Sequence, residues 1–255
     1  MGNTDVLVIG GGVIGCSIAL RLAEARVKVT LVERNTIGRE ASWAAAGMLS
    51  AQTHAAENGA FFELGLRSRG MYKEFANRLR DISGVDAEYQ DQGTLCLAMN
   101  EQEGKAMDEW VSWQQGAGLE VESLTSAEAR KLEPSVSGRT AGGVFLPQDH
   151  QVENRHLMES LQAALNRLGV EIVEGTEVNA LSVEGQRCTG VITASGAMTA
   201  GAVVLAAGSW SSSLLGDILP QVSVVPAKGQ MLALRGDRRP FSHIIYGERC
   251  YLAPR

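Results

Sequence analysis

The residues with the most specific chemistry in this sequence are three glycines and one acid near its beginning. Gly10, Gly12 and Gly15 form a G-x-G-x-x-G pattern, and Glu33 follows the third glycine by 18 residues. Such glycines allow a tight turn, let the backbone approach a pyrophosphate, and let a helix pack closely on a strand. An acid at this distance accepts hydrogen bonds from ribose hydroxyls and repels a 2′-phosphate. The pattern therefore predicts a dinucleotide site for NAD or FAD rather than NADP.

Three short elements must position these residues. The apolar run 6–9 predicts a strand that is buried on both faces. A helix is predicted over 13–25, because apolar residues recur there every four positions. A second strand over 29–32 places Glu33 at its carboxyl end. The amino end of the helix, with its free N–H groups and positive dipole, then faces the phosphates.

The composition of the chain excludes several other classes of protein. It has 255 residues, of which 45% are hydrophobic and 20% charged, enough to bury a sizeable core. A formal net charge of −6 offers no basic surface to a nucleic acid. No apolar run is long enough for a membrane span, and no positive charge precedes the run 6–20, so a signal sequence is not expected.

The four cysteines and four histidines show no spacing that is typical of a metal site. No C-x-x-C pair occurs, so neither a zinc site nor a disulfide framework is predicted. We therefore expect no metal, and a reducing cytoplasm fits this cysteine usage best.

Residues 37–48, IGREASWAAAGM, are mostly small. Such a segment lets the backbone lie against a flat ligand, or lets a helix pack closely on a sheet. Composition alone leaves both interpretations open.

The middle of the chain predicts three helices and a hairpin, and the first of these helices is interpreted as scaffold. Amphipathic patterns predict three helices, over 61–80, 106–115 and 126–132. Residues 85–99 alternate like strands around Gly93 and predict a hairpin. Trp110 and Trp113 are interpreted as buried packing residues rather than a stacking platform, because no basic residues accompany them.

From Gly142 the pattern indicates a return to the dinucleotide domain. A helix with leucines at helical spacing is followed by a predicted strand over 170–173. A hairpin is predicted over 181–194, and the apolar run 203–208 predicts another buried strand. Residues 223–251 are expected to form further strands.

Several stretches of this sequence resemble one family of flavoenzymes. VIGGGVIGCSIALRLAEARVKVTLVER, SWAAAGML and GAFFELGLRSRGMY occur in this order, followed by SGVD, DHQVEN, VVLAAGSWS, VPAKG and CYLAPR. On these motifs the chain resembles the D-amino acid oxidase and sarcosine oxidase family of FAD enzymes. It is most similar to the glycine-oxidising members, which serve thiamine biosynthesis. The resemblance extends to the last residue and favours FAD over NAD.

The resemblance implies an α/β fold, with a Rossmann-type FAD-binding domain and an inserted, largely antiparallel α+β substrate domain. We expect the FAD-binding domain over 1–84 and 142–218, and the substrate domain over 85–141 and 219–255. In this family a later segment supplies an arginine for the substrate carboxylate, and a glycine-rich strand and helix close over the flavin. Neither matches this chain, so we expect a fragment with an open FAD site, weak stability and low activity.

The resemblance also implies the residues of the site. Beside Gly10, Gly12 and Gly15, contacts with FAD are expected from Val13, Ile14, Glu33, Arg34, Ala41, Ser42, Ala46, Gly47, Met48, Val178, Ala207 and Gly208. Met48 should approach the isoalloxazine ring. Tyr246 and Tyr251 match substrate-facing positions, where a phenol can donate to a carboxylate, although each also fits a half-buried strand residue. Trp43 replaces the small or hydroxyl residue often found at its position, and the SWAAAG stretch has no histidine, so we expect FAD without a covalent link.

The activity implied by the resemblance is oxidation of glycine, sarcosine or a small D-amino acid. Hydride passes from the α-carbon to the flavin and oxygen is the final acceptor, which gives an imine (glyoxylate from glycine) and hydrogen peroxide. Two alternatives stay open: a D-amino acid dehydrogenase that uses a quinone or carrier, and an inactive flavin-binding fragment. The expected partners are the small amine and oxygen, with no nucleic acid; the sequence also allows a homo-oligomer.

Overall fold

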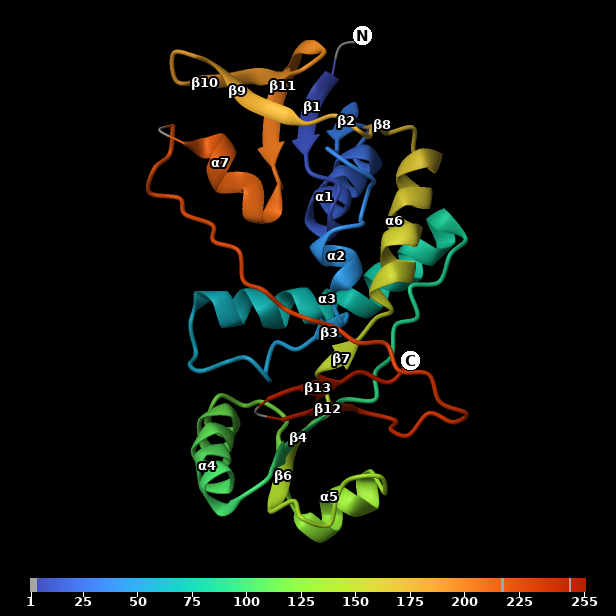
Figure 1. Ribbon diagram of the computed structural model, residues 1–255, viewed down its shortest axis with the longest axis vertical. Coiled ribbons are helices and arrows are strands. Elements are labelled where there is room, and N and C mark those ends of the chain that lie inside the picture. Colours follow the sequence, from blue (N-terminus) through green and yellow to red (C-terminus); the bar gives the residue numbers. More distant parts are fainter. Residues whose placement is uncertain (1–3, 217, 248) are drawn as a thin grey trace. The chain divides into compact units, whose positions relative to one another are not determined.

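The computed structural model describes residues 4–216, 218–247 and 249–255, and its chain divides into two compact units (Figure 1). Unit 1 comprises Met1–Ala45, Arg78–Ala87 and Asn154–Leu232. Unit 2 comprises Ala46–Asn77, Glu88–Glu153 and Ala233–Arg255. Each unit contains its own sheet and helices, in agreement with the expected α/β class.

Unit 1 is built on a six-stranded sheet with the order β8-β2-β1-β11-β10-β9. The strands are β1 (Thr4–Ile9), β2 (Val29–Val32), β8 (Glu171–Val173), β9 (Val178–Glu184), β10 (Arg187–Thr193) and β11 (Gly196–Leu205). The first four in the spatial order run parallel, and β10 and β9 are antiparallel additions. Strand β1 therefore lies between β2 and β11, as Figure 1 shows. The predicted strands over 6–9, 29–32 and 170–173 and the hairpin over 181–194 are confirmed. The strand predicted over 203–208 ends at Leu205 as part of β11, and its residues are half-buried rather than buried.

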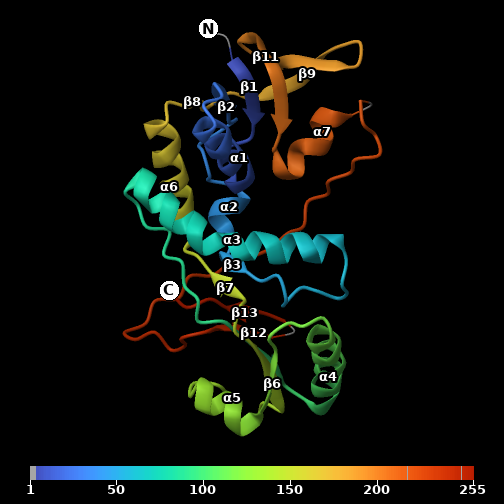
Figure 2. The same cartoon turned by 180° about the vertical axis from the view of Figure 1, so that it is seen from behind.

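The helices of unit 1 include those predicted from the apolar spacing. They are α1 (Val13–Glu24), α2 (Ala41–Ala44), α6 (Asn154–Arg167), α7 (Ser211–Leu215) and the 3-10 helix η1 (Gly208–Trp210). Helix α1 packs against α6, and Figure 2 shows the pair from behind. Helix α6 carries buried Leu157, Leu161 and Leu165, which are spaced by four residues and so share one helix face.

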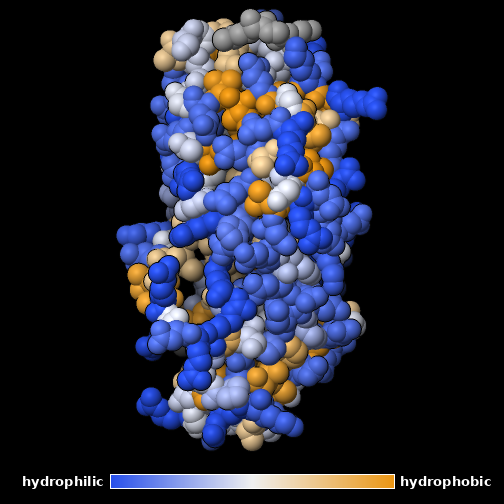
Figure 3. All heavy atoms as spheres, turned by 90° about the vertical axis from the view of Figure 1, so that its right-hand side faces the viewer, coloured by the Kyte–Doolittle hydropathy of each residue, from blue (hydrophilic) through white to orange (hydrophobic). Residues whose placement is uncertain are grey.

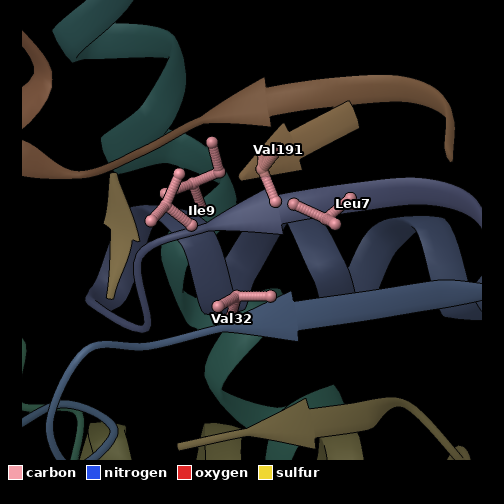
Figure 4. Close-up of a cluster of buried hydrophobic side chains, with 5 residues drawn as sticks. Leu7, Ile9, Val32 and Val191 are labelled. Carbon is pink, nitrogen blue, oxygen red and sulfur yellow. The ribbon is translucent and has the colours of Figure 1, made fainter. Parts of the chain in front are cut away.

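The core of unit 1 lies where the parallel strands meet the β9–β10 hairpin. Leu7 and Ile9 point to the same face of β1, because side chains alternate along a strand. Figure 4 shows them beside Val32 of β2 and Val191 of β10, and Val178 completes this buried cluster. All four residues of β2 are buried, which explains its unbroken apolar sequence.

The turn between β1 and α1 requires glycine for steric reasons. Gly10 has a φ of 102°, and a Cβ at this position would overlap the carbonyl oxygen of Ala206. A Cβ at Gly15 would overlap the carbonyl oxygen of Gly10. Helix α1 can therefore start directly against the end of β1 only because these side chains are absent.

Unit 2 contains a five-stranded sheet with the order β13-β12-β4-β6-β5. Its strands are β4 (Thr94–Ala98), β5 (Glu122–Thr125), β6 (Gly142–Leu146), β12 (Ile244–Tyr246) and β13 (Tyr251–Leu252). All neighbours are antiparallel except β12 and β4, so the sheet is largely antiparallel, as expected. A separate two-stranded ladder joins β3 (Met48–Leu49) to β7 (His150–Gln151).

The three predicted helices of the middle region are present. They are α3 (Ala60–Ser83), whose last residues belong to unit 1, α4 (Glu101–Gly116) and α5 (Ser126–Leu132). The tryptophans make packing contacts, as predicted, but both are half-buried rather than buried. Trp113 meets Phe62 edge to face at 5.5 Å, and Trp110 Nε1 donates to the carbonyl of Ala55 at 2.9 Å.

Three predictions from strand patterns are wrong. Residues 85–99 do not form a hairpin, because β4 pairs with β6 on one side and β12 on the other and is buried throughout. The chain does not leave the second sheet at Gly142, since residues 142–146 are β6 of that sheet. Of residues 223–251, the described part forms only β12 and the start of β13, and 221–240 are exposed.

The division into units also differs from the expected domain boundaries. Residues 46–77 and 142–153 belong to unit 2 rather than with the dinucleotide fold, because β3 pairs with β7 and β6 pairs with β4. Residues 219–232 belong to unit 1, where Val224 exchanges two hydrogen bonds with the Ser212 hydroxyl.

The surface agrees with the charged composition of the chain. The face drawn in Figure 3 is mostly hydrophilic, with smaller hydrophobic areas between. Within the described ranges, no helix is both long and apolar enough to cross a bilayer.

A buried ion pair organises unit 2. Asp149 is fully buried and accepts from the N–H of Gln52 and of Thr53. Arg69 Nη1 donates to Asp149 Oδ1 and to Gln52 Oε1, both at 2.7 Å. The Gln52 amide in turn donates to Gln114 of α4. This network ties the segment after β3 to α3, α4 and the turn before β7.

Replacing Gly15 with alanine should destabilise the chain by about 1–3 kcal/mol, because the added methyl group forces the start of α1 away from the β1 turn. Gly104→Ala is the matched control, since Gly104 lies inside α4 with open space around it and should gain roughly 0.5–1 kcal/mol. Urea denaturation followed by circular dichroism measures both. Equal midpoints for Gly15→Ala and the unsubstituted chain would contradict this steric account.

Replacing Arg69 with methionine should destabilise unit 2 by about 3–5 kcal/mol, because it leaves the buried Asp149 carboxylate without its cation. The control is Lys73→Met on the same helix, where the ion pair with Asp91 is exposed and its loss should barely change the denaturation midpoint. Similar midpoints for the two variants would show that the Arg69 pair has no special importance.

Candidate nucleotide and substrate sites

A pocket of about 500 Å³ lies in unit 1 at the carboxyl ends of its parallel strands. Its walls are formed by the residues that follow β1, β2 and β11, together with the start of β9. In open parallel sheets, ligands bind at this end, where the connections diverge to opposite sides. Here β1 connects through α1 to β2 on one side, and β11 lies on its other side. The pocket is therefore at the position where a nucleotide is expected.

The pocket brings together nearly all the residues of unit 1 that the sequence associates with the cofactor. Those lining it are Gly10, Gly12, Val13, Ile14, Glu33, Arg34, Ala41, Ser42, Val178, Ala207 and Gly208. Gly15 lies beneath the turn and does not line the pocket. Ala46, Gly47 and Met48 belong to unit 2 and are described with it.

Glu33 is buried yet retains hydrogen-bonding capacity. Its Oε2 accepts from the N–H of Gly11 at 2.8 Å, and its Oε1 accepts from the N–H of Asn35 at 2.9 Å. A carboxylate has about four acceptor positions, so two remain for a ligand hydroxyl. The two backbone bonds fix the orientation of the carboxylate, which suits it to hold a ribose.

One backbone N–H group at the amino end of α1 already has a hydrogen-bond acceptor within the protein, which the sequence alone did not predict. The N–H of Val13 donates to the hydroxyl of Ser42 at 2.9 Å. Ser42 is itself positioned by α2, whose carbonyls at Ser42 and Trp43 accept from the side-chain amide of Asn154, both at 2.8 Å. The small residues after Ile37 thus include a short helix that brings a hydroxyl to the glycine turn.

The pocket lining also includes a pair of opposite charges. Arg34 Nη2 donates to Glu40 Oε1 at 2.9 Å, and the Asn35 amide donates to the same oxygen. The hydrogen bond from Arg34 is the main cause that lowers the pKa of Glu40 below its usual value. The Arg34 guanidinium also lies over the ring of Trp210.

These features fit the adenosine diphosphate half of a dinucleotide. The glycine turn lets backbone approach a pyrophosphate, Glu33 offers acceptors to ribose, and Arg34 supplies a positive charge. Cys16 lies below the turn, where burial, and secondly the charge of Glu33, raises the pKa of its thiol to about 12. That thiol is therefore not a nucleophile near neutral pH.

Some lining residues were not predicted from the sequence. They are Glu40, Thr176, Glu177, Asn179, Ser209, Trp210, Ser213 and Leu214, together with the strand residues Ile9, Val32 and Ala206. Trp210 is the largest of them. The only local indication of its role is its position just after Gly208, which follows the apolar run of β11.

In unit 2, Met48 lies in a segment that is held from several directions. Met48 pairs with Gln151 in the β3–β7 ladder, and the N–H of Val152 donates to the carbonyl of Gly47 at 2.9 Å. Arg255 donates to the carbonyl of the buried Ala46 and forms an ion pair with Glu153. The backbone at the three predicted positions 46–48 is therefore fixed by its surroundings.

Met48 also lines a second pocket, of about 490 Å³, formed by the loop after β3 and by α3. Phe61, Phe62 and Tyr72 supply aromatic walls, and Arg69 is the one arginine among the lining residues. The guanidinium of Arg69 is already engaged by Gln52, Asp149 and Gln148. This arginine is therefore a structural residue and not a free partner for a carboxylate.

The two predicted substrate-facing tyrosines are brought together. Tyr246 of β12 and Tyr251 of β13 form a cross-strand pair whose rings are stacked, with centroids 6.3 Å apart. His54, which lines the second pocket, meets the ring of Tyr246 edge on at 5.5 Å. Cross-strand partners share one face of a sheet, so both tyrosines are on the same face.

No group of three or more His, Cys, Asp or Glu side chains in the described part of the chain is arranged to hold a metal ion. The four cysteines are free thiols.

Comparison with known proteins identifies the family. The family model described as FAD dependent oxidoreductase matches residues 5–255. A glycine oxidase of Bacillus licheniformis is 36% identical over 252 residues, which cover 98% of this chain and 66% of that protein. A bifunctional protein ThiO/ThiG of Synechocystis sp. is also 36% identical, over 99% of this chain and 37% of its own length. The chain thus spans less than two thirds of each of these relatives.

The fold comparison gives the same result. The crystal structure of a glycine oxidase from Bacillus cereus matches with a TM-score of 0.92 and 38% identity, covering 99% of this chain and 68% of that one. A glycine oxidase structure from Geobacillus kaustophilus matches with a TM-score of 0.88 and 30% identity, over 98% and 68% of the two chains. With the dinucleotide pocket, the family match and these structural relatives in agreement, this chain belongs to the FAD dependent oxidoreductase family, and its cofactor is FAD.

Proposed function

We propose that this protein oxidises glycine or a small related amine, such as sarcosine or a small D-amino acid, and passes the electrons to oxygen. The observation that carries the proposal is the pocket of unit 1, lined by the residues that resemblance associates with FAD, in a chain 38% identical to a solved glycine oxidase. The reaction converts the amine and oxygen into an imine and hydrogen peroxide, and the imine from glycine hydrolyses to glyoxylate and ammonia.

In this proposal unit 1 binds and orients FAD. The turn at Gly10 and Gly12 lies against the pyrophosphate, Glu33 accepts hydrogen bonds from the ribose, and Val178 contacts the adenine with its backbone. FAD, when bound, accepts a hydride from the α-carbon of the amine. We infer that it is not covalently linked, since the 42–47 stretch contains no histidine.

Unit 2 is proposed to orient the substrate. Met48 is assigned to the isoalloxazine side of the site, with Ala46 and Gly47 beside it. Tyr246 and Tyr251 are assigned to the substrate, where a phenol O–H donates to the amino acid carboxylate. Orientation of the α-carbon is then the main contribution of the protein, and a general base is not required. The free thiols support a reducing cytoplasm as the proposed compartment.

The proposal is tested by mixing the purified protein with glycine in the absence of oxygen and following the visible flavin bands. The bands should bleach, and admission of oxygen should restore them with release of hydrogen peroxide. Sarcosine and D-alanine are tested in the same way. Bleaching without peroxide, followed by reoxidation by a quinone, would support the dehydrogenase alternative instead. Bands that persist with all three amines would support the other alternative, an inactive flavin-binding fragment.

Replacing Tyr251 with phenylalanine should raise KM for glycine about tenfold while changing kcat less, because the hydrogen bond from a phenol to a carboxylate is lost. Tyr89→Phe is the control, since the Tyr89 hydroxyl is bonded to His150 Nδ1 at 2.6 Å and is not assigned to the substrate. Steady-state oxygen uptake measures both variants. An unchanged KM for Tyr251→Phe, or an equal rise for Tyr89→Phe, would remove Tyr251 from the substrate site.

A further inference from the structure

One contact in unit 1 joins the two walls of the nucleotide pocket. The Arg34 Cζ atom lies 3.7 Å from the centroid of the Trp210 ring, within the range of a cation–π interaction. The guanidinium is held in place by its hydrogen bond to Glu40. Both Arg34 and Trp210 line the pocket.

The topology shows what this contact crosses. Arg34 follows the carboxyl end of β2, and Trp210 ends η1, which follows β11. Strands β2 and β11 flank β1 on opposite sides. The contact between Arg34 and Trp210 therefore spans the carboxyl end of β1, where the turn at Gly10 begins. A dinucleotide held on that turn must lie in the crevice that the contact bridges.

The contact between Arg34 and Trp210 is exposed to solvent and is weak enough to break without disturbing the fold. Trp210 is 44% exposed, and 29% of the Arg34 side chain is exposed. Cation–π interactions between exposed groups are weak compared with buried pairs. The two side chains can therefore separate without disruption of the sheet to which they are attached.

We propose that Arg34 and Trp210 form a latch across the nucleotide crevice, which opens to admit FAD and slows its release once closed. Trp210 is then a cofactor-retaining residue of this chain. The proposal rests on the FAD site of unit 1 and not on the amine that the protein oxidises.

The chain contains a matched control for this latch. The Arg39 Cζ atom lies 3.6 Å from the centroid of the Trp43 ring, so the same chemistry occurs a few residues away. Trp43 is not among the residues that line the nucleotide pocket. A variant at Trp43 therefore loses an arginine–tryptophan stack without opening the crevice.

The test measures the association and dissociation rates of FAD by stopped-flow flavin fluorescence. In the dissociation measurement, excess ADP occupies the emptied site and prevents FAD from binding again. Trp210→Leu keeps apolar bulk but removes the aromatic face, and both rates should rise about tenfold. Trp210→Phe keeps an aromatic face and should stay within about threefold of the unsubstituted chain. Trp43→Leu should leave both rates unchanged, and thermal unfolding checks that each variant is folded.

The proposal is overturned if Trp210→Leu leaves the dissociation rate unchanged, or if only dissociation accelerates, which would make Trp210 a simple wall of the pocket. Equal effects of Trp43→Leu and Trp210→Leu would also overturn it, by indicating a general loosening of unit 1. These rates are measured without an amine. Failure of the latch and failure of the proposed amine oxidation are therefore separate results.

Discussion

The absence of a side chain at Gly15 is the constraint on which the nucleotide site depends. With no Cβ there, the first turn of α1 rests against the carbonyl of Gly10 at the end of β1. This contact sets the position of the helix terminus relative to the sheet. It thereby also sets the position of the Val13 N–H, which donates to the Ser42 hydroxyl. Gly10 itself is fixed from the other side, because its backbone lies against Ala206 after β11. Three neighbouring strands therefore converge on one turn, and the pocket is the space that remains above it.

A different kind of interaction organises unit 2. There the segment that carries Met48 has little regular structure, and its position is determined by polar contacts around Asp149. A fully buried carboxylate is costly unless it is paired and hydrogen-bonded. Arg69 and the N–H groups of Gln52 and Thr53 meet that requirement together. The proposed flavin-facing segment is thus attached to a network that tolerates few alternative geometries.

The features that depend on neighbouring residues along the chain were predicted correctly from the sequence. The predictions failed where the structure depends on pairing between strands that are far apart in the sequence. The β1 turn, α1, β2 and Glu33 form one continuous stretch, so spacing and periodicity were sufficient there. Residues 85–99 and 142–146 were misassigned, because β4 and β6 pair with each other and β4 also pairs with β12, which is about 150 residues further along. The alternation of apolar and polar residues within a strand contains no information about which distant strand it pairs with.

The same limit applies to the candidate site. All the predicted cofactor residues of unit 1 except Gly15 line one pocket. The role of Trp210 could not be inferred, since it follows from the position of β11 beside β1. Likewise, the sequence offered Tyr246 and Tyr251 as separate candidates, and only the β12–β13 register shows that their rings stack.

Competition between nucleotides shows whether unit 1 binds FAD through its adenosine diphosphate half. FAD is titrated into the purified chain while flavin fluorescence is followed, and ADP or FMN is then added in excess. We expect one FAD to bind per chain. ADP should displace it, and FMN, which lacks the adenosine half, should not. Displacement by FMN but not by ADP, or no binding of FAD at all, would show that unit 1 does not hold FAD by its adenosine diphosphate half.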